Sequence, residues 1–202
     1  QRLLVRAEAA NDILRVLELK RDYPAIKMVL VGVSEGWRVA DRIAASGVPV
    51  IASALNDLPA TFELLGATQS NIGRMKDAGV KVSIGMIDDR DSHQLRYTTQ
   101  YAGNLVSLQK VPRATGLTWD EAFAAISSGP AEAMGMGDKL GSLKAGRVGD
   151  VVVWDGDPLE LSSAPVSVYI DGVEQPLSNR QNRLRDRYRT PQEGNLPKAY
   201  EH

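Results

Sequence analysis

The feature that most constrains this chain is the regular alternation, through its first half, of continuous apolar runs with amphipathic stretches. The apolar runs predict strands at 3–7, 26–33, 48–55 and 80–86. The stretches between them predict helices at 11–23, 35–46 and 59–79, with Asn11 as an N-cap and Gly47 as a C-cap. Strands that are apolar along their whole length and separated by helices predict a parallel sheet covered on both faces.

Four such βα units, followed by a stretch at 94–111, suit either a doubly wound sheet or part of a (β/α)8 barrel. A dinucleotide-binding sheet is disfavoured because no Gly-rich phosphate loop follows any predicted strand. We therefore favour the barrel, of which four units make only half.

The second half of the chain does not continue the alternation of apolar runs and amphipathic stretches. A capping box from Thr118 to Glu121 predicts the start of a helix that stops at SSGP, and a second short helix is expected to begin at Pro130. The stretches that follow predict β-hairpin strands, with DGDP and DGVE as turns. The last stretch, 178–202, is basic and then rich in Pro and Gly, and predicts a surface helix and tail.

Composition excludes several classes of function. The net charge of −1 on 202 residues gives no electrostatic footprint for nucleic acid or an anionic membrane, and no stretch is long and apolar enough to cross a bilayer. The absence of Cys rules out disulfides, thiolate metal sites and Cys nucleophiles, and fits cytoplasm and periplasm equally. The chain opens without Met or a signal peptide, almost directly on a strand, which suggests the C-terminal portion of a longer polypeptide.

One long motif points to a family. The run GLTWDEAFAAISSGPAEAMGMGDKLGSLKAGRVGDVVVWDGDPLEL resembles the C-terminal signature of the amidohydrolase superfamily, in particular its imidazolonepropionase-like branch. That signature is a helix ending in Pro-Ala, a Leu-Gly-Ser-Leu turn, a Gly with a basic residue, and a strand leading into Asp-Gly-Asp-Pro. The matching positions are Pro130, Ala131, Leu140 to Leu143, Gly146, Asp150 to Val153 and Asp155 to Pro158.

The resemblance implies a (β/α)8 barrel joined to a small β-sandwich built from both chain ends. Residues 1–137 would supply the second half of the barrel, strands five to eight with their helices. Residues 138–177 would supply the C-terminal part of the sandwich, and 178–202 the surface helix and tail. Half a barrel exposes two sheet edges and cannot close its core, so we expect a partner: the missing N-terminal half or another chain.

The resemblance also implies an activity. The complete protein would hydrolyse a C–N bond other than a peptide bond, in a small cyclic amide, imidazolone-like or dipeptide-like substrate. A divalent metal, zinc above all, would activate the attacking water. The alternative is a non-catalytic, degenerate subunit that acts as a scaffold or regulator. A homo-oligomer is expected in either case.

In such enzymes the typical ligands are a His after the fifth strand, a His after the sixth and an Asp, also the general base, after the eighth. The resemblance places Arg6 and Gly32 at the two His positions, and neither can hold a metal. Gapless counting puts Ile87 at the Asp position. A one-residue bulge would bring Asp88 there, so Asp88 is the candidate metal ligand, and Asp88 and Asp89 are the candidate catalytic carboxylates.

Three interpretations of the stretch SIGMIDDRDSH stay open. In the first, Asp88 or Asp89 binds metal and takes the proton, while His93 contacts the substrate. In the second, the acids cap the next helix, where carboxylates meet the positive end of its dipole. In the third, Asp91 and its neighbours are merely exposed.

Two further rim residues are candidates for substrate binding. Glu35 follows the predicted strand 26–33 and would contact either the substrate or a neighbouring strand, the latter being a structural role. Arg6 would either bind a substrate carboxylate or neutralise a nearby acid.

Overall fold

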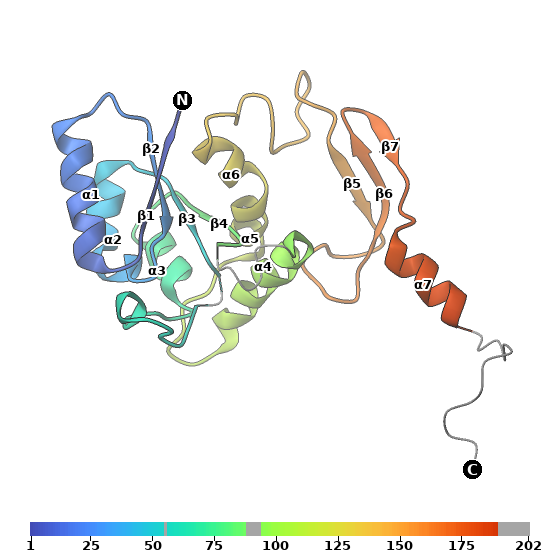
Figure 1. Cartoon of the computed structure of the whole chain (residues 1–202), viewed down its shortest axis with the longest axis horizontal. Coiled ribbons are helices and arrows are strands. Elements are labelled where there is room, and N and C mark those ends of the chain that lie inside the picture. Colours follow the sequence, from blue (N-terminus) through green and yellow to red (C-terminus); the bar gives the residue numbers. More distant parts are fainter. Residues whose placement is uncertain (55, 88–93, 190–202) are drawn as a thin grey trace, which may run out of the picture.

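The computed structural model describes residues 1–54, 56–87 and 94–189, which form a parallel sheet with its helices and a separate antiparallel sheet (Figure 1). The parallel strands follow each other in chain order across the sheet. They are β1 (Leu3–Ala7), β2 (Met28–Gly32), β3 (Val50–Ala52) and β4 (Val82–Ile84). The predicted α/β architecture with a parallel sheet is therefore confirmed.

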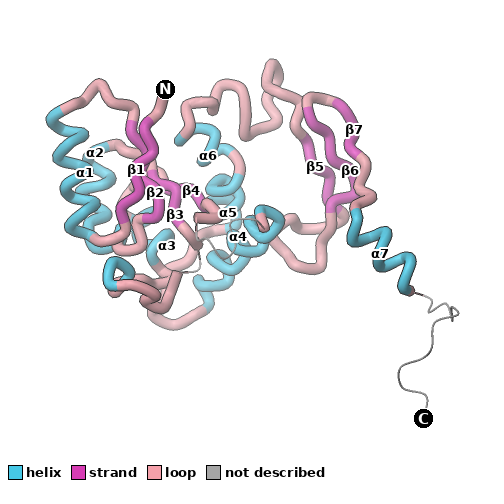
Figure 2. Tube along the Cα trace, viewed as in Figure 1, coloured by secondary structure: helices cyan, strands magenta, loops and turns pink. Residues whose placement is uncertain are grey.

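The helices and short 3-10 turns of this part alternate with the strands (Figure 2). The α-helices are α1 (Ala10–Asp22), α2 (Ala40–Ser46), α3 (Asn71–Asp77) and α4 (Thr98–Ser107). The 3-10 turns are η1 (Gly36–Val39), η2 (Phe62–Leu64), η3 (Leu95–Tyr97) and η4 (Leu108–Lys110). Among the described residues, no helix has the length and apolar character needed to cross a membrane.

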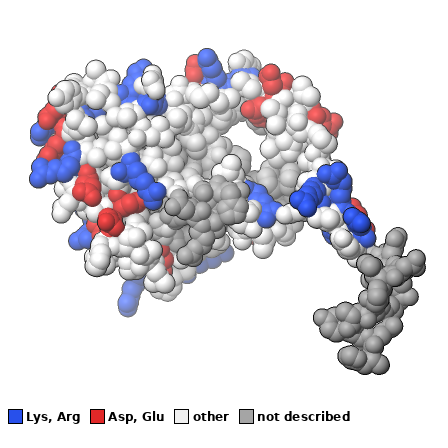
Figure 3. All heavy atoms as spheres, viewed as in Figure 1, with Lys and Arg blue, Asp and Glu red and all other residues white. Residues whose placement is uncertain are grey.

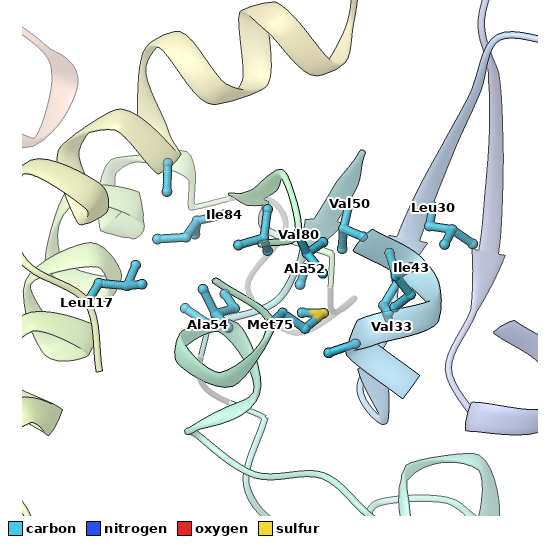
Figure 4. Close-up of a cluster of buried hydrophobic side chains, with 14 of the residues drawn as sticks. Leu30, Val33, Ile43, Val50, Ala52, Ala54, Met75, Val80, Ile84 and Leu117 are labelled. Carbon is cyan, nitrogen blue, oxygen red and sulfur yellow. The ribbon is translucent and has the colours of Figure 1, made fainter. Parts of the chain in front are cut away.

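The core lies on the face of the sheet that the helices cover. Leu30 of β2 pairs in register with Val50 of β3, and Val50 pairs with Val82 of β4. Because side chains alternate along a strand, these residues share one face, and they belong to one buried cluster with Ile43 and Met75. Figure 4 shows Leu30 and Val50 of this cluster together with Ile43 and Met75. Leu4 of β1 points to the opposite face of the sheet and is exposed.

Two local predictions from the sequence are wrong, namely Asn11 as an N-cap and a single helix over 59–79. Asn11 is not the N-cap of the first helix, because α1 begins at Ala10 with Ala9 as its N-cap residue and no side-chain cap. The Ala10 N–H is satisfied instead by the carboxylate of Glu35, at 3.0 Å from Oε2. Gly47, by contrast, has φ 65° and ends α2 in the left-handed conformation, as predicted.

The stretch 59–79 is not one helix. Only its last third, α3, is α-helical, and the earlier part holds the short turn η2. Gly66 lies between the two, with its N–H donating to Glu35 Oε1 at 2.8 Å and its carbonyl accepting from Trp37 Nε1 at 2.7 Å. These bonds to a distant segment hold the backbone out of a continuous helix.

The second half follows the predicted order of helices and hairpin strands. The capping box is present at the start of α5 (Trp119–Ile126), and α6 (Ser128–Ala133) begins two residues before the predicted Pro130. The antiparallel strands are β5 (Val151–Trp154), β6 (Pro165–Ile170) and β7 (Val173–Gln175). The DGVE turn joins β6 to β7, with positive φ at Asp171 and Gly172.

The antiparallel sheet stands beside the α/β part, and α7 (Arg180–Tyr188) extends from it (Figure 1). No residue of α7 is buried. On the face seen in Figure 3, cationic and anionic side chains are interspersed over the α/β part, and Arg side chains gather on α7. The domain boundaries drawn from the sequence stay predictions.

Candidate functional site

The candidate site lies where the parallel strands β1 and β2 end, because ligands of α/β sheets bind outside the carboxyl ends of the strands. β1 ends at Ala7 and β2 at Gly32, and their register pairs these two residues. The polar residues that follow each strand therefore meet at one rim, and Arg6 lies just inside it.

An ion pair occupies this rim. Arg6 Nε donates to Glu8 Oε1 at 3.0 Å. The other carboxylate oxygen of Glu8 accepts from Ser34 N at 3.1 Å and from Ser34 Oγ at 2.8 Å. Only 13% of the Glu8 side chain is exposed, whereas 56% of the Arg6 side chain is exposed. Glu8 is thus a mostly buried carboxylate with three donors, whereas more than half of the Arg6 side chain is exposed.

Glu8 also fills the space in which a side chain at position 32 would begin. A Cβ placed on Gly32 would lie 2.2 Å from Glu8 Oε1 and 2.6 Å from its Cδ. Gly32 has φ 90°, which is a conformation that glycine adopts without strain. Position 32 therefore has neither the room nor the backbone geometry for a larger side chain while Glu8 stays in place.

The described rim residues do not fit a metal ion. Arg6 carries a permanent positive charge, Gly32 has no ligand atom in its side chain, and Glu8 is already held by three donors. Across residues 1–54, 56–87 and 94–189, no group of three or more His, Cys, Asp or Glu side chains is placed to hold a metal.

A strained turn builds this arrangement. Val33 is buried with φ 57°, which is unusual for a β-branched residue. Its carbonyl accepts from Asn71 Nδ2 at 2.9 Å, and Asn71 Oδ1 accepts from Trp37 N at 2.9 Å. The turn places the N–H and hydroxyl of Ser34 within hydrogen-bonding distance of Glu8, so local strain is offset by these buried and partly buried hydrogen bonds.

Glu35 joins three segments of the rim. Besides Ala10 N and Gly66 N, its carboxylate contacts Arg38 Nη1 at 3.4 Å, and 9% of its side chain is exposed. A carboxylate at the first N–H of α1 also meets the positive end of the helix dipole. These contacts are those of the structural role that the sequence left open beside substrate binding.

The predicted catalytic and metal-binding residues Asp88, Asp89 and His93 lie outside the described residues. Their proposed roles stay predictions.

Sequence reasoning missed Glu8, Ser34 and Asn71. The signal for Glu8 was its place directly after a strand, two residues from Arg6. Ser34 and Asn71 gave no such signal, because their roles arise from contacts 26 and 38 residues away in the chain. Asn56, whose Nδ2 donates to Ser34 Oγ at 3.2 Å, extends the cluster to the loop after β3.

Comparison with known proteins places these residues in context. The family model described as "Amidohydrolase family" matches residues 25–182. Amidohydrolase tasK of Hapsidospora irregularis is 50% identical over 60 residues, which is 30% of this chain and 6% of that protein. Imidazolonepropionase of Bacillus velezensis is 31% identical over 127 residues, which is 62% of this chain and 27% of that protein.

Among solved structures, an amidohydrolase from Thermotoga maritima superposes with a TM-score of 0.73 at 24% identity, covering 86% of this chain and 43% of that one. At that identity the likeness supports the fold alone. The chain spans less than half the length of each of these three proteins.

Proposed function

The chain belongs to the amidohydrolase family, in its imidazolonepropionase-like branch, and from that premise we propose that the complete protein hydrolyses a C–N bond other than a peptide bond. The substrate class we propose is a small cyclic amide, an imidazolone-like ring or a dipeptide-like molecule. The observation that carries this proposal is the family match over residues 25–182, which includes the strand ends β2 to β4 and the hairpin sheet.

We further propose that the parallel sheet is the second half of a (β/α)8 barrel. The sheet order β1-β2-β3-β4 supports this, because each strand lies beside its neighbour in sequence, as barrel strands do. Both β1 and β4 are edge strands, and Leu3 and Leu4 of β1 are exposed. The partner that covers this edge would be the other barrel half, in the same polypeptide or in another chain.

Zinc is the metal we propose for the complete enzyme, and its ligands cannot be the described rim residues. Asp88 is this chain's candidate ligand, with the remaining ligands supplied by the other half of the barrel. When bound, the metal would supply an activated water for attack on the carbonyl. Asp88 or Asp89 would take the proton from that water as general base.

Arg6 is the described residue best placed to meet a substrate. Its Nε is held by Glu8, while no bond of its two terminal amino groups is found within the described part of the chain. A guanidinium fixed in this way presents a fork that suits a carboxylate on the substrate. Glu8 would then orient Arg6, and Ser34 would orient Glu8.

The test is an assay of the full-length protein against cyclic amides, imidazolones and dipeptides, together with elemental analysis. We expect turnover of at least one class and stoichiometric zinc. Replacing the general base, by Asp88→Asn or Asp89→Asn, should lower kcat about 10²- to 10⁴-fold, while Asp77→Asn on the exposed side of α3 should leave it unchanged. A metal-free protein that refuses added zinc and turns over none of these compounds would contradict the proposal and favour a scaffold or regulator.

A further inference from the structure

A cavity of about 280 Å³ lies at the opposite end of the parallel sheet, between the amino ends of β3 and β4 and the helices α5 and α6. Figure 1 shows α6 at this end, on the side of the chain's N-terminus. The lining residues are Arg2, Gly47, Pro49, Lys76, Lys81, Val82, Glu121, Ala124, Ala125, Ser128, Gly129, Glu132 and Ala133.

Three cationic residues from separate places in the chain line this cavity. Arg2 precedes β1, Lys76 lies in the last turn of α3, and Lys81 precedes β4. Within the described part of the chain, none of the three forms an ion pair or a side-chain hydrogen bond. Arg2 and Lys76 are nevertheless only partly exposed. Cations that line one concave site favour a bound anion there.

Close packing fixes at least one of these cations. A Cβ placed on Gly135 would lie 2.5 Å from Arg2 Nη2 and 2.7 Å from Nε, so the guanidinium rests directly on the backbone of this glycine. Gly135 has φ 73° and follows α6, whose C-terminal carbonyls attract a cation. Arg2 is therefore held at the cavity wall rather than free to extend into solvent.

The rest of the wall sets the size and chemistry of a ligand. Small residues such as Ala124 and Gly129 leave the space open. Two carboxylates also line the cavity, but Glu121 is engaged in the capping box, where its Oε2 accepts from Thr118 N at 3.0 Å. That leaves Glu132 to oppose the three cations. A ligand that places an oxyanion at the cations and a hydroxyl or amine at Glu132 complements both walls.

We infer that this cavity binds a small oxyanionic metabolite, through a phosphate or carboxylate group held by Arg2, Lys76 and Lys81. The site lies at the opposite end of the sheet from the rim of Arg6 and Glu8 and is separate from the proposed hydrolytic site. The inference does not depend on the proposed function.

The experiment is a titration of the purified, isotopically labelled protein with inorganic phosphate, followed by backbone amide shifts. Succinate and citrate form parallel arms that separate a phosphate site from a carboxylate site, and sodium chloride at matched ionic strength is the control. We expect saturable shifts that cluster at Gly47, Lys81 and Gly129. Lys76→Gln and Lys81→Gln should each weaken binding about tenfold, whereas Lys110→Gln, on the separate turn η4, should not.

Three results would overturn the inference. The first is the absence of saturable shifts at these amides with phosphate, succinate and citrate alike. The second is a set of shifts that sodium chloride reproduces, and the third is binding that Lys110→Gln weakens as much as Lys76→Gln does. The shift map of the unmodified protein decides the question even if a variant fails to fold.

Discussion

The two ends of the parallel sheet differ in whether their charged side chains have partners within the described part of the chain. At the carboxyl end, Glu8 and Glu35 are caged by hydrogen bonds and paired with Arg6 and Arg38. At the amino end, three cations line a cavity without an ion pair among the described residues. The rim follows the carboxyl ends of β1 and β2, whereas the cavity lies mainly at the amino ends of β3 and β4, with Arg2 preceding β1.

The charges at the carboxyl end therefore maintain the fold, whereas those at the amino end are available to bind a ligand. A buried carboxylate that accepts several N–H bonds stabilises the segments it joins, and removing it leaves those donors unsatisfied. A cation without a partner contributes little to the stability of the fold, and an anion that binds to it stabilises the folded state. Substitutions at the carboxyl end should therefore mainly lower stability, and substitutions at the amino end should mainly reduce the response to an anion.

The largest loss of stability is expected for Glu35→Ala. It removes a buried carboxylate and leaves the partly buried Ala10 and Gly66 N–H groups, and Arg38, without their shared acceptor, which should cost about 3 kcal/mol in the free energy of unfolding. Urea denaturation measures this change. Glu160→Ala, at an exposed position, is the control and should stay within about 0.5 kcal/mol of the unmodified protein. Equal losses of stability in the two variants would show that Glu35 has no special structural role.

The next effect is expected for Gly32→Ala, which forces a methyl group into the Glu8 carboxylate and adds strain at φ 90°. We expect a cost of about 2–3 kcal/mol. Gly47→Ala is a matched control, since Gly47 has φ 65° and open space around its Cβ position, and strain alone should cost about 1 kcal/mol.

A double-mutant cycle sharpens this prediction. In a Glu8→Ala background the clash disappears, so Gly32→Ala should cost at least about 1 kcal/mol less than it does alone. Strictly additive costs would show that Glu8 does not occupy the space above Gly32 in solution.

A smaller effect is expected for Glu8→Gln, which keeps the shape but removes the charge that pairs with Arg6. The loss should be about 1–2 kcal/mol, because Glu8 is mostly buried and accepts charge-assisted bonds. The exposed pair Arg15–Glu18 is the comparison, and Glu18→Gln should cost less than about 0.5 kcal/mol. If both changes cost the same, the rim pair is no more than a surface ion pair.

The sequence predicted the sheet because its strands are buried and apolar, and burial imposes that pattern. It also predicted the helix end at Gly47, since a left-handed residue there favours glycine. It failed for 59–79 and for Asn11, because the deciding bonds run from Glu35 to Gly66 and to Ala10, 31 and 25 residues away. Such contacts depend on strand register, which local patterns do not carry.

For the candidate site, too, local patterns carry only part of the information. Position at a strand end singled out Arg6 and Glu35, and their locations at the rim agree with it. Glu8 was missed because its importance rests on Ser34 and on the empty side-chain position at Gly32. The acidic residues Asp88 and Asp89 and the neighbouring His93 lie outside the described residues, so their part of the prediction is untested.

The most direct test of the contrast between the two ends is a pair of thermal unfolding curves, for Glu8→Gln and Lys76→Gln, recorded with and without phosphate. Without phosphate, Glu8→Gln should lower the melting temperature, and Lys76→Gln should leave it close to that of the unmodified protein. With phosphate, the melting temperature of Glu8→Gln should rise as it does for the unmodified protein, and that of Lys76→Gln should not. If Lys76→Gln destabilises the protein as much as Glu8→Gln without phosphate, and both respond to phosphate alike, the account is contradicted.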